Sequence, residues 1–91
     1  MTKKDETVEK PEPTREEILK LTLKGREQEI MHYQLNIDNY TLALEELGSL
    51  PADERAELAG FTEQLSSLLL SEKLEQKKSK IMLKVIQRQL G

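Results

Sequence analysis

The chain has 91 residues and a formal net charge of −3, and 36% of its residues are hydrophobic and 34% charged. That length allows one domain and leaves too little core for a large enzyme. There is no cysteine and only one histidine, which excludes disulfides, thiolate zinc sites, a thiol nucleophile and an imidazole cluster. Sixteen of the 33 hydrophobic residues are leucine and seven are valine or isoleucine, which predicts an all-α protein rather than a β-sandwich or barrel.

Residues 1–13 are predicted to form a disordered N-terminal tail. After the initiator, this segment has one apolar residue, Val8, together with Pro11 and Pro13. Such a segment cannot bury enough apolar surface to offset the entropy that it would lose on ordering. It also lacks the apolar stretch of a secretory signal, and no run in the chain approaches the ~20 apolar residues of a membrane span. We therefore expect a cytoplasmic protein without a membrane span.

A first helix is predicted for residues 14–47. Thr14 and Glu17 have the spacing of a capping box, in which each side chain accepts a hydrogen bond from the other residue's backbone N–H. The residues that follow repeat at the a and d positions of heptads, with Arg26 as the only charged member, and this repeat predicts a coiled-coil seam. The seam residues are Leu19, Leu23, Arg26, Ile30, Tyr33, Ile37, Tyr40, Leu44 and Leu47.

A turn at residues 48–51 and a second helix at residues 52–90 are predicted to follow. Gly48 is expected to end the first helix in the left-handed conformation. Two long helices with a short connection pack antiparallel, so residues 14–91 are predicted to form a helical hairpin. The inward side of the second helix is predicted to comprise Leu58, Phe61, Leu65, Leu68, Leu69, Leu83, Ile86 and Leu90.

Polar residues interrupt the predicted seam near its middle. They are Arg26 on the first helix and Glu72, Gln76 and Ser79 on the second. Interruptions of this kind fix the register of a coiled coil. If the chain turns near residue 49, Arg26 lies level with Glu72, and we expect the two to form an ion pair there.

Both predicted helices carry further apolar residues on the side that faces away from the seam. These residues are Leu21, Met31, Leu35, Leu42, Leu70, Leu74, Ile81 and Val85. One hairpin has one internal seam and cannot bury them, so they are predicted to form an oligomer or partner interface. The first interpretation is a homodimer in which two hairpins form a four-helix bundle. The alternatives are a groove for a partner's helix and a fold-back into a monomeric three-helix domain.

A row of basic residues, called the basic ridge below, follows the last helix beside this apolar surface. The ridge consists of Lys73, Lys77, Lys80, Lys84 and Arg88. Steps of three and four residues place all five on one side of the helix. One interpretation is a solvated face that pairs in part with acidic residues of the first helix, namely Glu16, Glu17, Glu27 and Glu29. The other is a surface that binds an acidic protein in preference to nucleic acid, because no aromatic residue lies beside the ridge to stack a base.

The residue pattern predicts a protein that is not an enzyme and uses no cofactor or metal. His32 has no second metal ligand at a suitable spacing, and the glycines are isolated and form no phosphate-binding loop. Acidic pairs such as Glu16–Glu17 and Glu45–Glu46 are surface charges on helices, without the enclosed site that general acid–base chemistry needs. Catalytic and cofactor-binding residues are accordingly predicted to be absent.

Two segments resemble small phage- or prophage-encoded helical accessory proteins of bacteria. They are residues 26–40, REQEIMHYQLNIDNY, and residues 75–80, EQKKSK. The resemblance implies a bacterial or phage setting and a role exerted by binding. We therefore expect a small protein–protein interaction module, such as an adaptor, chaperone or inhibitor. The alternatives are a nucleic-acid-associated regulator that uses the basic ridge and a structural assembly subunit.

Overall fold

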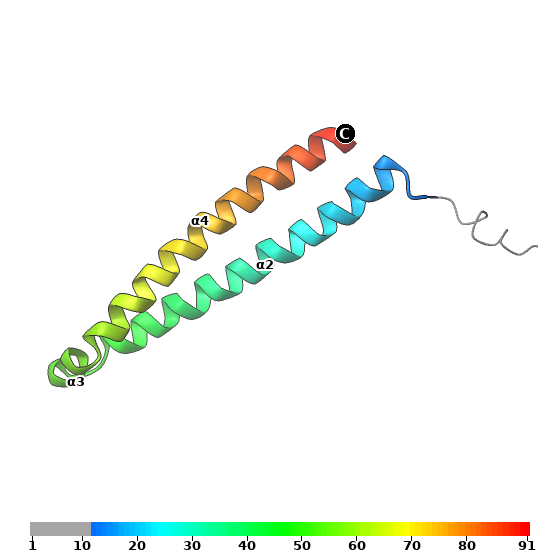
Figure 1. Cartoon of the computed structure of the whole chain (residues 1–91). Helices are drawn as coiled ribbons and strands as arrows, with labels where there is room; N and C mark the ends of the chain where they lie inside the picture. The colour runs from blue at the N-terminus through cyan, green and yellow to red at the C-terminus, as the bar shows by residue number, and fades with distance from the viewer. Residues whose placement is uncertain (1–11) are drawn as a thin grey trace, which may run out of the picture.

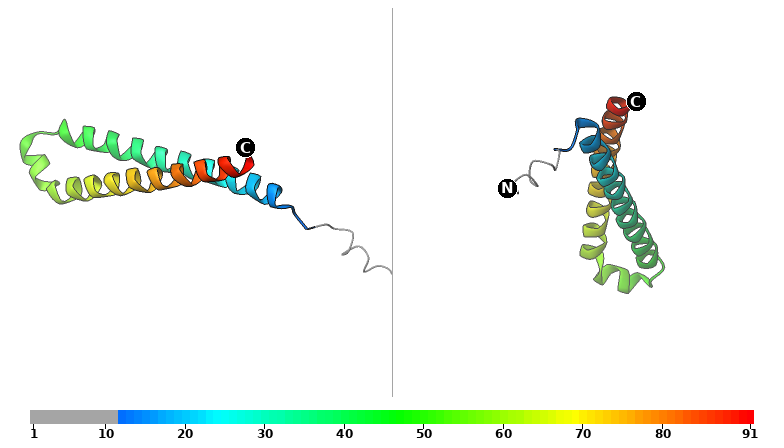
Figure 2. Two further views of the ribbon diagram at one scale, coloured as in Figure 1. Left: turned by 90° about the horizontal axis from the view of Figure 1, so that it is seen from above. Right: turned by 90° about the vertical axis from the view of Figure 1, so that its right-hand side faces the viewer.

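The computed structural model describes residues 12–91, which form three helices. Helix α2 spans Arg15–Gly48, α3 spans Ala52–Glu57 and α4 spans Ala59–Leu90. The long helices α2 and α4 pack against each other as the two arms of an antiparallel hairpin, and α3 forms its tip (Figures 1 and 2). The all-α prediction is confirmed, because residues 12–91 contain no strand. Most of the predicted tail, residues 1–11, lies outside the described residues.

The N-terminus of α2 is capped as the sequence predicts. Thr14 Oγ1 accepts a hydrogen bond from the backbone N–H of Glu17 at 3.1 Å, and Glu17 Oε1 accepts one from the backbone N–H of Thr14 at 2.8 Å. These bonds satisfy donors that a helix start otherwise leaves unpaired. Glu16 and Glu17 also place negative charge at the positive end of the helix dipole.

The end of α2 differs from the prediction at Gly48. This residue is the last of the helix, and no glycine in residues 12–91 has a positive φ, so the predicted left-handed cap is wrong. Ser49 is the C-cap instead, and its backbone N–H donates to the carbonyl oxygens of Glu45 and Glu46, both at 3.2 Å. The Ser49 hydroxyl donates to Glu46 O at 2.8 Å. These bonds satisfy terminal carbonyl groups that a left-handed glycine would otherwise help to satisfy.

The predicted helix at residues 52–90 is divided at Leu58. Leu58 has φ −104° and ψ 16°, outside helical geometry, and it separates the short α3 from α4. The chain therefore reverses through residues 49–58 rather than through the four residues 48–51. This longer tip shifts the pairing of the two arms, with consequences for the polar residues described below.

The seam follows heptad spacing on both arms. On α2, all nine predicted seam residues are buried or half-buried. On α4, the inward residues alternate in steps of three and four and are Thr62, Leu65, Leu69, Glu72, Gln76, Ser79, Leu83, Ile86 and Leu90. Three residues predicted to lie inward, Leu58, Phe61 and Leu68, are instead 38%, 48% and 40% exposed. A step of 100° per residue collects a wider side of the helix than one partner helix can cover, so these three lie on its flank.

The hydrophobic core of the hairpin is small. Four hydrophobic side chains in residues 12–91 are buried, Ile37, Leu47, Leu65 and Ile86, whereas thirteen large ones are exposed. Two helices cannot surround a side chain on all sides, so most seam residues stay half-buried. A single hairpin therefore gains less from apolar burial than a globular domain of the same length.

We expect truncation of Ile37 to destabilise the protein far more than truncation of Leu35, two residues away on the same helix. Ile37 is buried in the seam, so Ile37→Ala should lower the free energy of unfolding by about 2–5 kcal/mol. Leu35 is 56% exposed, so Leu35→Ala should change it by at most about 0.5 kcal/mol. Urea denaturation at low protein concentration, followed by circular dichroism, measures both. Equal losses would contradict the assigned seam.

Candidate interaction surfaces

Polar side chains occupy the middle of the seam. Gln76 and Ser79 on α4 are buried, with 7% and 3% of their surface exposed. Gln76 Nε2 donates to Gln34 Oε1 at 2.9 Å and to Ile30 O at 3.3 Å. These bonds satisfy an amide whose burial without a partner would cost about 1–3 kcal/mol.

A second group of polar side chains continues this layer. The Ser79 hydroxyl donates to Glu29 Oε1 at 2.6 Å, and Arg26 Nη1 donates to the same oxygen at 2.8 Å. Asn36 Nδ2 donates to Glu72 Oε1 at 2.7 Å. The predicted Arg26–Glu72 ion pair is therefore wrong. The longer tip shifts the register, so that Arg26 lies opposite Ser79 and Glu72 lies opposite Asn36.

These hydrogen bonds define the register of the hairpin. We call the residues that make them the polar layer, which comprises Arg26, Glu29, Gln34, Asn36, Glu72, Gln76 and Ser79. If one arm slipped by a heptad, the Gln76 amide and the Ser79 hydroxyl would face apolar side chains without their partners. Because an unpaired buried polar group is costly, the layer favours one alignment over others. The predicted role of the polar interruptions in fixing the register has this physical basis.

Two side chains at the polar layer have shifted pKa values. The hydrogen bond from Ser79 lowers the pKa of the Glu29 carboxyl, desolvation opposes it, and the hydrogen bond and charge of Arg26 lower it further. Burial raises the pKa of the Tyr33 hydroxyl, and the negative charge of Glu29 raises it further. The layer therefore favours an ionised Glu29 beside a neutral Tyr33.

We expect Glu29 to contribute to a loss of stability in acid. Its pKa is lowered in the folded chain, so its contribution is present above the ordinary value of 4.5 and is lost as the pH falls through the folded value. Ser79→Ala removes the hydrogen bond that lowers this pKa most, and should make the stability less dependent on pH below about 5. Urea denaturation at a series of pH values measures this slope. The control is Glu27→Gln, because Glu27 forms no ion pair within residues 12–91. An unchanged slope in Ser79→Ala would contradict the assignment.

The eight apolar residues predicted to form an interface lie outside the seam, and each is at least 41% exposed. Leu35 lies two residues from Ile37, and Ile81 lies two residues from Ser79, which is about 200° around the helix in both cases. The two groups therefore point away from each other, on opposite outer edges of the hairpin. We call Leu21, Met31, Leu35 and Leu42 the α2 outer face, and Leu70, Leu74, Ile81 and Val85 the α4 outer face.

All five residues of the basic ridge are exposed. Within residues 12–91 the ion pairs are Lys20–Glu16 at 3.1 Å, Arg26–Glu29 at 2.8 Å and Lys78–Glu75 at 3.0 Å, and none of them includes a ridge residue. The predicted pairing of the ridge with acidic residues of the first helix is therefore absent from this part of the chain.

Three of these four acidic residues have local partners, and the fourth, Glu27, forms no ion pair within residues 12–91. Glu16 pairs with Lys20, Glu17 caps Thr14, and Glu29 bonds within the polar layer. The ridge accordingly presents its charge to solvent along the α4 outer face.

Three exposed apolar side chains on the flank of α4 were not predicted to be exposed or to form an interface. They are Phe61, Leu68 and Met82, which are 48%, 40% and 43% exposed. The intervals between them are multiples of seven residues. The heptad pattern of α4, once it is aligned on Thr62, places all three beside the seam rather than within it. That alignment is the sequence signal that identifies them.

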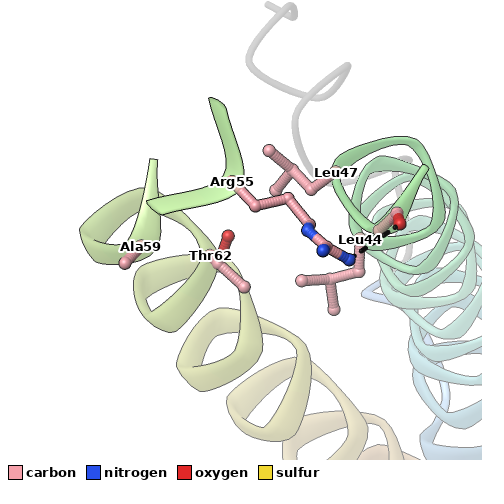
Figure 3. A pocket seen from close by; sticks show the side chains of 6 residues that line it. Leu44, Leu47, Arg55, Ala59 and Thr62 are labelled. Carbon is pink, nitrogen blue, oxygen red and sulfur yellow. Dashed lines mark hydrogen bonds between the residues drawn. The ribbon is translucent and has the colours of Figure 1, made fainter. Parts of the chain in front are cut away.

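A hollow of about 270 Å³ lies at the tip of the hairpin (Figure 3). It is lined by Leu44, Leu47, Gly48, Arg55, Ala59 and Thr62. The Arg55 side chain extends beside Leu44 and Leu47, and its Nη1 donates to Gly48 O at 3.5 Å. The negative end of the α2 dipole stabilises a cation at this position. The local pattern around Arg55 could not predict this contact, because it depends on how α3 folds back on α2.

Comparisons of the chain with models of protein families, with curated proteins and with solved structures found no match. In the part of the chain that the structure describes, no group of three or more His, Asp or Glu side chains is placed to hold a metal ion. No helix there is long and apolar enough to cross a membrane. The outer faces, the basic ridge and the polar layer are therefore the features from which a function can be argued.

Proposed function

We propose that the protein is a small non-enzymatic protein–protein interaction module that associates with copies of itself through its outer faces. The observation that supports this proposal is the exposure of all eight outer-face residues on a hairpin that buries only four hydrophobic side chains. Extended exposed apolar surfaces of this kind mark interaction sites. Association would give the small core the additional apolar burial that a single hairpin lacks.

Apolar contact between the outer faces supports only weak association by itself. Full burial of a Leu or Ile side chain is worth ~1.5–3 kcal/mol, so covering the exposed half of one is worth roughly 1 kcal/mol. Two outer faces of four residues each would then contribute about 8 kcal/mol, against about 4–15 kcal/mol of lost translational and rotational freedom. The net gain is then at most about 4 kcal/mol, which corresponds to a dissociation constant of about 1 mM. Apolar contact alone therefore supports only weak association, and complementary charge is needed for micromolar affinity.

The position of the outer faces bears on the form of the assembly. Two hairpins that meet through one outer face each bring four helices together, as in the predicted four-helix bundle. Because the two faces of one hairpin lie on opposite edges, such a homodimer covers one face of each copy. The remaining faces are then open to a protein partner or to further copies, and in the latter case the protein is a structural assembly subunit.

We propose a bacterial or phage setting for this module, and a cytoplasmic location. The resemblance of residues 26–40 and 75–80 to small phage- or prophage-encoded accessory proteins supports the setting. In that setting, a module that acts by binding would serve as an adaptor, a chaperone or an inhibitor of another protein.

A nucleic-acid-associated regulator is the second candidate function. The exposed basic ridge, unpaired within residues 12–91, favours it. The net charge of −3 and the acidic residues around the tip oppose it, because phosphate binding depends on positive potential. In a titration with a short DNA duplex we expect no binding even at about 50 mM salt, whereas binding that weakens steeply with salt would favour this candidate.

We expect the wild-type chain to associate in a concentration-dependent manner, and Leu74→Gln combined with Ile81→Gln to reduce that association. Leu74 is 49% exposed and Ile81 is 61% exposed, so the double change should leave the helical content unchanged. Sedimentation velocity over a concentration series measures the association. The matched control is Phe61→Gln with Leu68→Gln, which removes similar exposed apolar surface from the flank of the same helix. A wild-type chain that stays monomeric at high micromolar concentration would contradict the proposed function.

A further inference from the structure

We infer that the α4 outer face of one copy docks on the α2 outer face of a second copy, so that the hairpins associate head to tail. This inference rests on the proposed self-association and specifies which two surfaces meet. It depends on the charges that surround the two faces.

The α4 outer face is surrounded by basic residues. Lys77 lies four residues before Ile81 and Lys84 three residues after it, so both flank that side chain on one side of the helix. The acidic residues of this part of α4 lie elsewhere. Glu72 bonds Asn36 in the polar layer, and Glu75 pairs with Lys78. The α4 outer face is therefore apolar with a positive border.

The α2 outer face has a negative border around Leu35 and Leu42, whereas Lys24 lies three residues after Leu21. Asp38 lies three residues after Leu35, and Glu45 and Glu46 lie three and four residues after Leu42. All three acidic residues are exposed, and none forms an ion pair within residues 12–91. Asp38 accepts a hydrogen bond only from the neutral Gln34 amide, at 2.9 Å. These carboxylates are therefore available to a cation on another molecule.

Charge distinguishes the three ways in which the outer faces could meet. Two α4 outer faces would bring two basic ridges together, and two α2 outer faces would bring two sets of carboxylates together. Like charges along a helix interface oppose association, whereas unlike charges beside an apolar contact set partner and orientation. The contact between an α2 outer face and an α4 outer face places the lysines of the basic ridge beside these carboxylates. Two antiparallel α2 outer faces would bring only Lys24 of each copy to them, because Lys20 pairs with Glu16.

The dimensions of the two faces suit this contact. At ~1.5 Å per residue, Leu21 to Leu42 spans about 32 Å and Leu70 to Val85 about 23 Å, so the shorter face fits within the longer one. Because the two faces lie on opposite edges of one hairpin, each copy can engage two neighbours. A heterologous contact of this type produces a ring or an open array rather than a closed twofold dimer.

Two blocked variants test the inference by sedimentation velocity. Leu35→Gln with Leu42→Gln blocks the α2 outer face, and Leu74→Gln with Ile81→Gln blocks the α4 outer face. We expect each variant alone to associate at least about tenfold more weakly than the wild type. An equimolar mixture should form a heterodimer through the two intact faces and should not grow further. Circular dichroism of each variant checks that the hairpin remains folded.

A charge exchange within one chain gives an independent test. Lys77→Glu with Lys84→Glu should weaken association, and adding Asp38→Lys and Glu45→Lys to the same chain should restore it, because unlike charges again face each other. Added salt should weaken the association of the wild type. The same weak association in the double and the quadruple variant would overturn the inference.

The remaining outcomes are distinct from one another. If the variant with a blocked α2 outer face associates as strongly as the wild type, the contact is a twofold one between α4 outer faces; the inference is then overturned while the proposed interaction module stands. If the wild type itself stays monomeric, both fail. Binding of a monomeric chain to vesicles of anionic phospholipid would overturn the inference in favour of a lipid surface.

Discussion

Two helices share one seam, and that seam can cover only one side of each helix. This constraint accounts for most of what distinguishes the molecule. Within residues 12–91 it leaves four hydrophobic side chains buried and thirteen large ones exposed. The exposed side chains are not scattered, because eight of them form the two outer faces of the hairpin, outside the seam. A chain with such faces has more apolar surface to cover than its own fold can enclose.

The polar layer adds specificity to the seam at a cost in stability. Gln76 and Ser79 are buried at positions where apolar residues would contribute more apolar burial. In return, their bonds to Gln34 and Glu29 favour one alignment of the arms. The stability of a hairpin with a defined register but a small core depends on association. A partner that binds only the folded state raises the apparent stability of that state.

Local signals in the sequence predicted the local features of the fold. The capping box at Thr14 and the heptads from Leu19 to Leu47 required only neighbouring residues, and both are confirmed. The features that depend on the tip were not predictable in this way. The C-cap at Ser49 and the break at Leu58 arise from how α3 turns the chain. They shift the register of the two arms, so that Arg26 lies opposite Ser79 rather than Glu72. The exposure of the eight outer-face residues could be predicted, because one seam covers only one side of each helix. The absence of ion pairs between the basic ridge and α2 could not, because three of the four acidic residues have local partners that only the structure shows.

We expect association to cover the outer faces of the hairpin. The chain has no cysteine, so Leu35→Cys introduces a single thiol on the α2 outer face, and its rate of modification reports the exposure of that face. The matched control is Thr22→Cys, at an exposed position on the flank of the same helix. We expect the thiol at position 35 to react rapidly in dilute protein and progressively more slowly as the protein concentration rises, while the thiol at position 22 reacts at a constant rate. A thiol at position 35 that reacts equally fast at every concentration would contradict it.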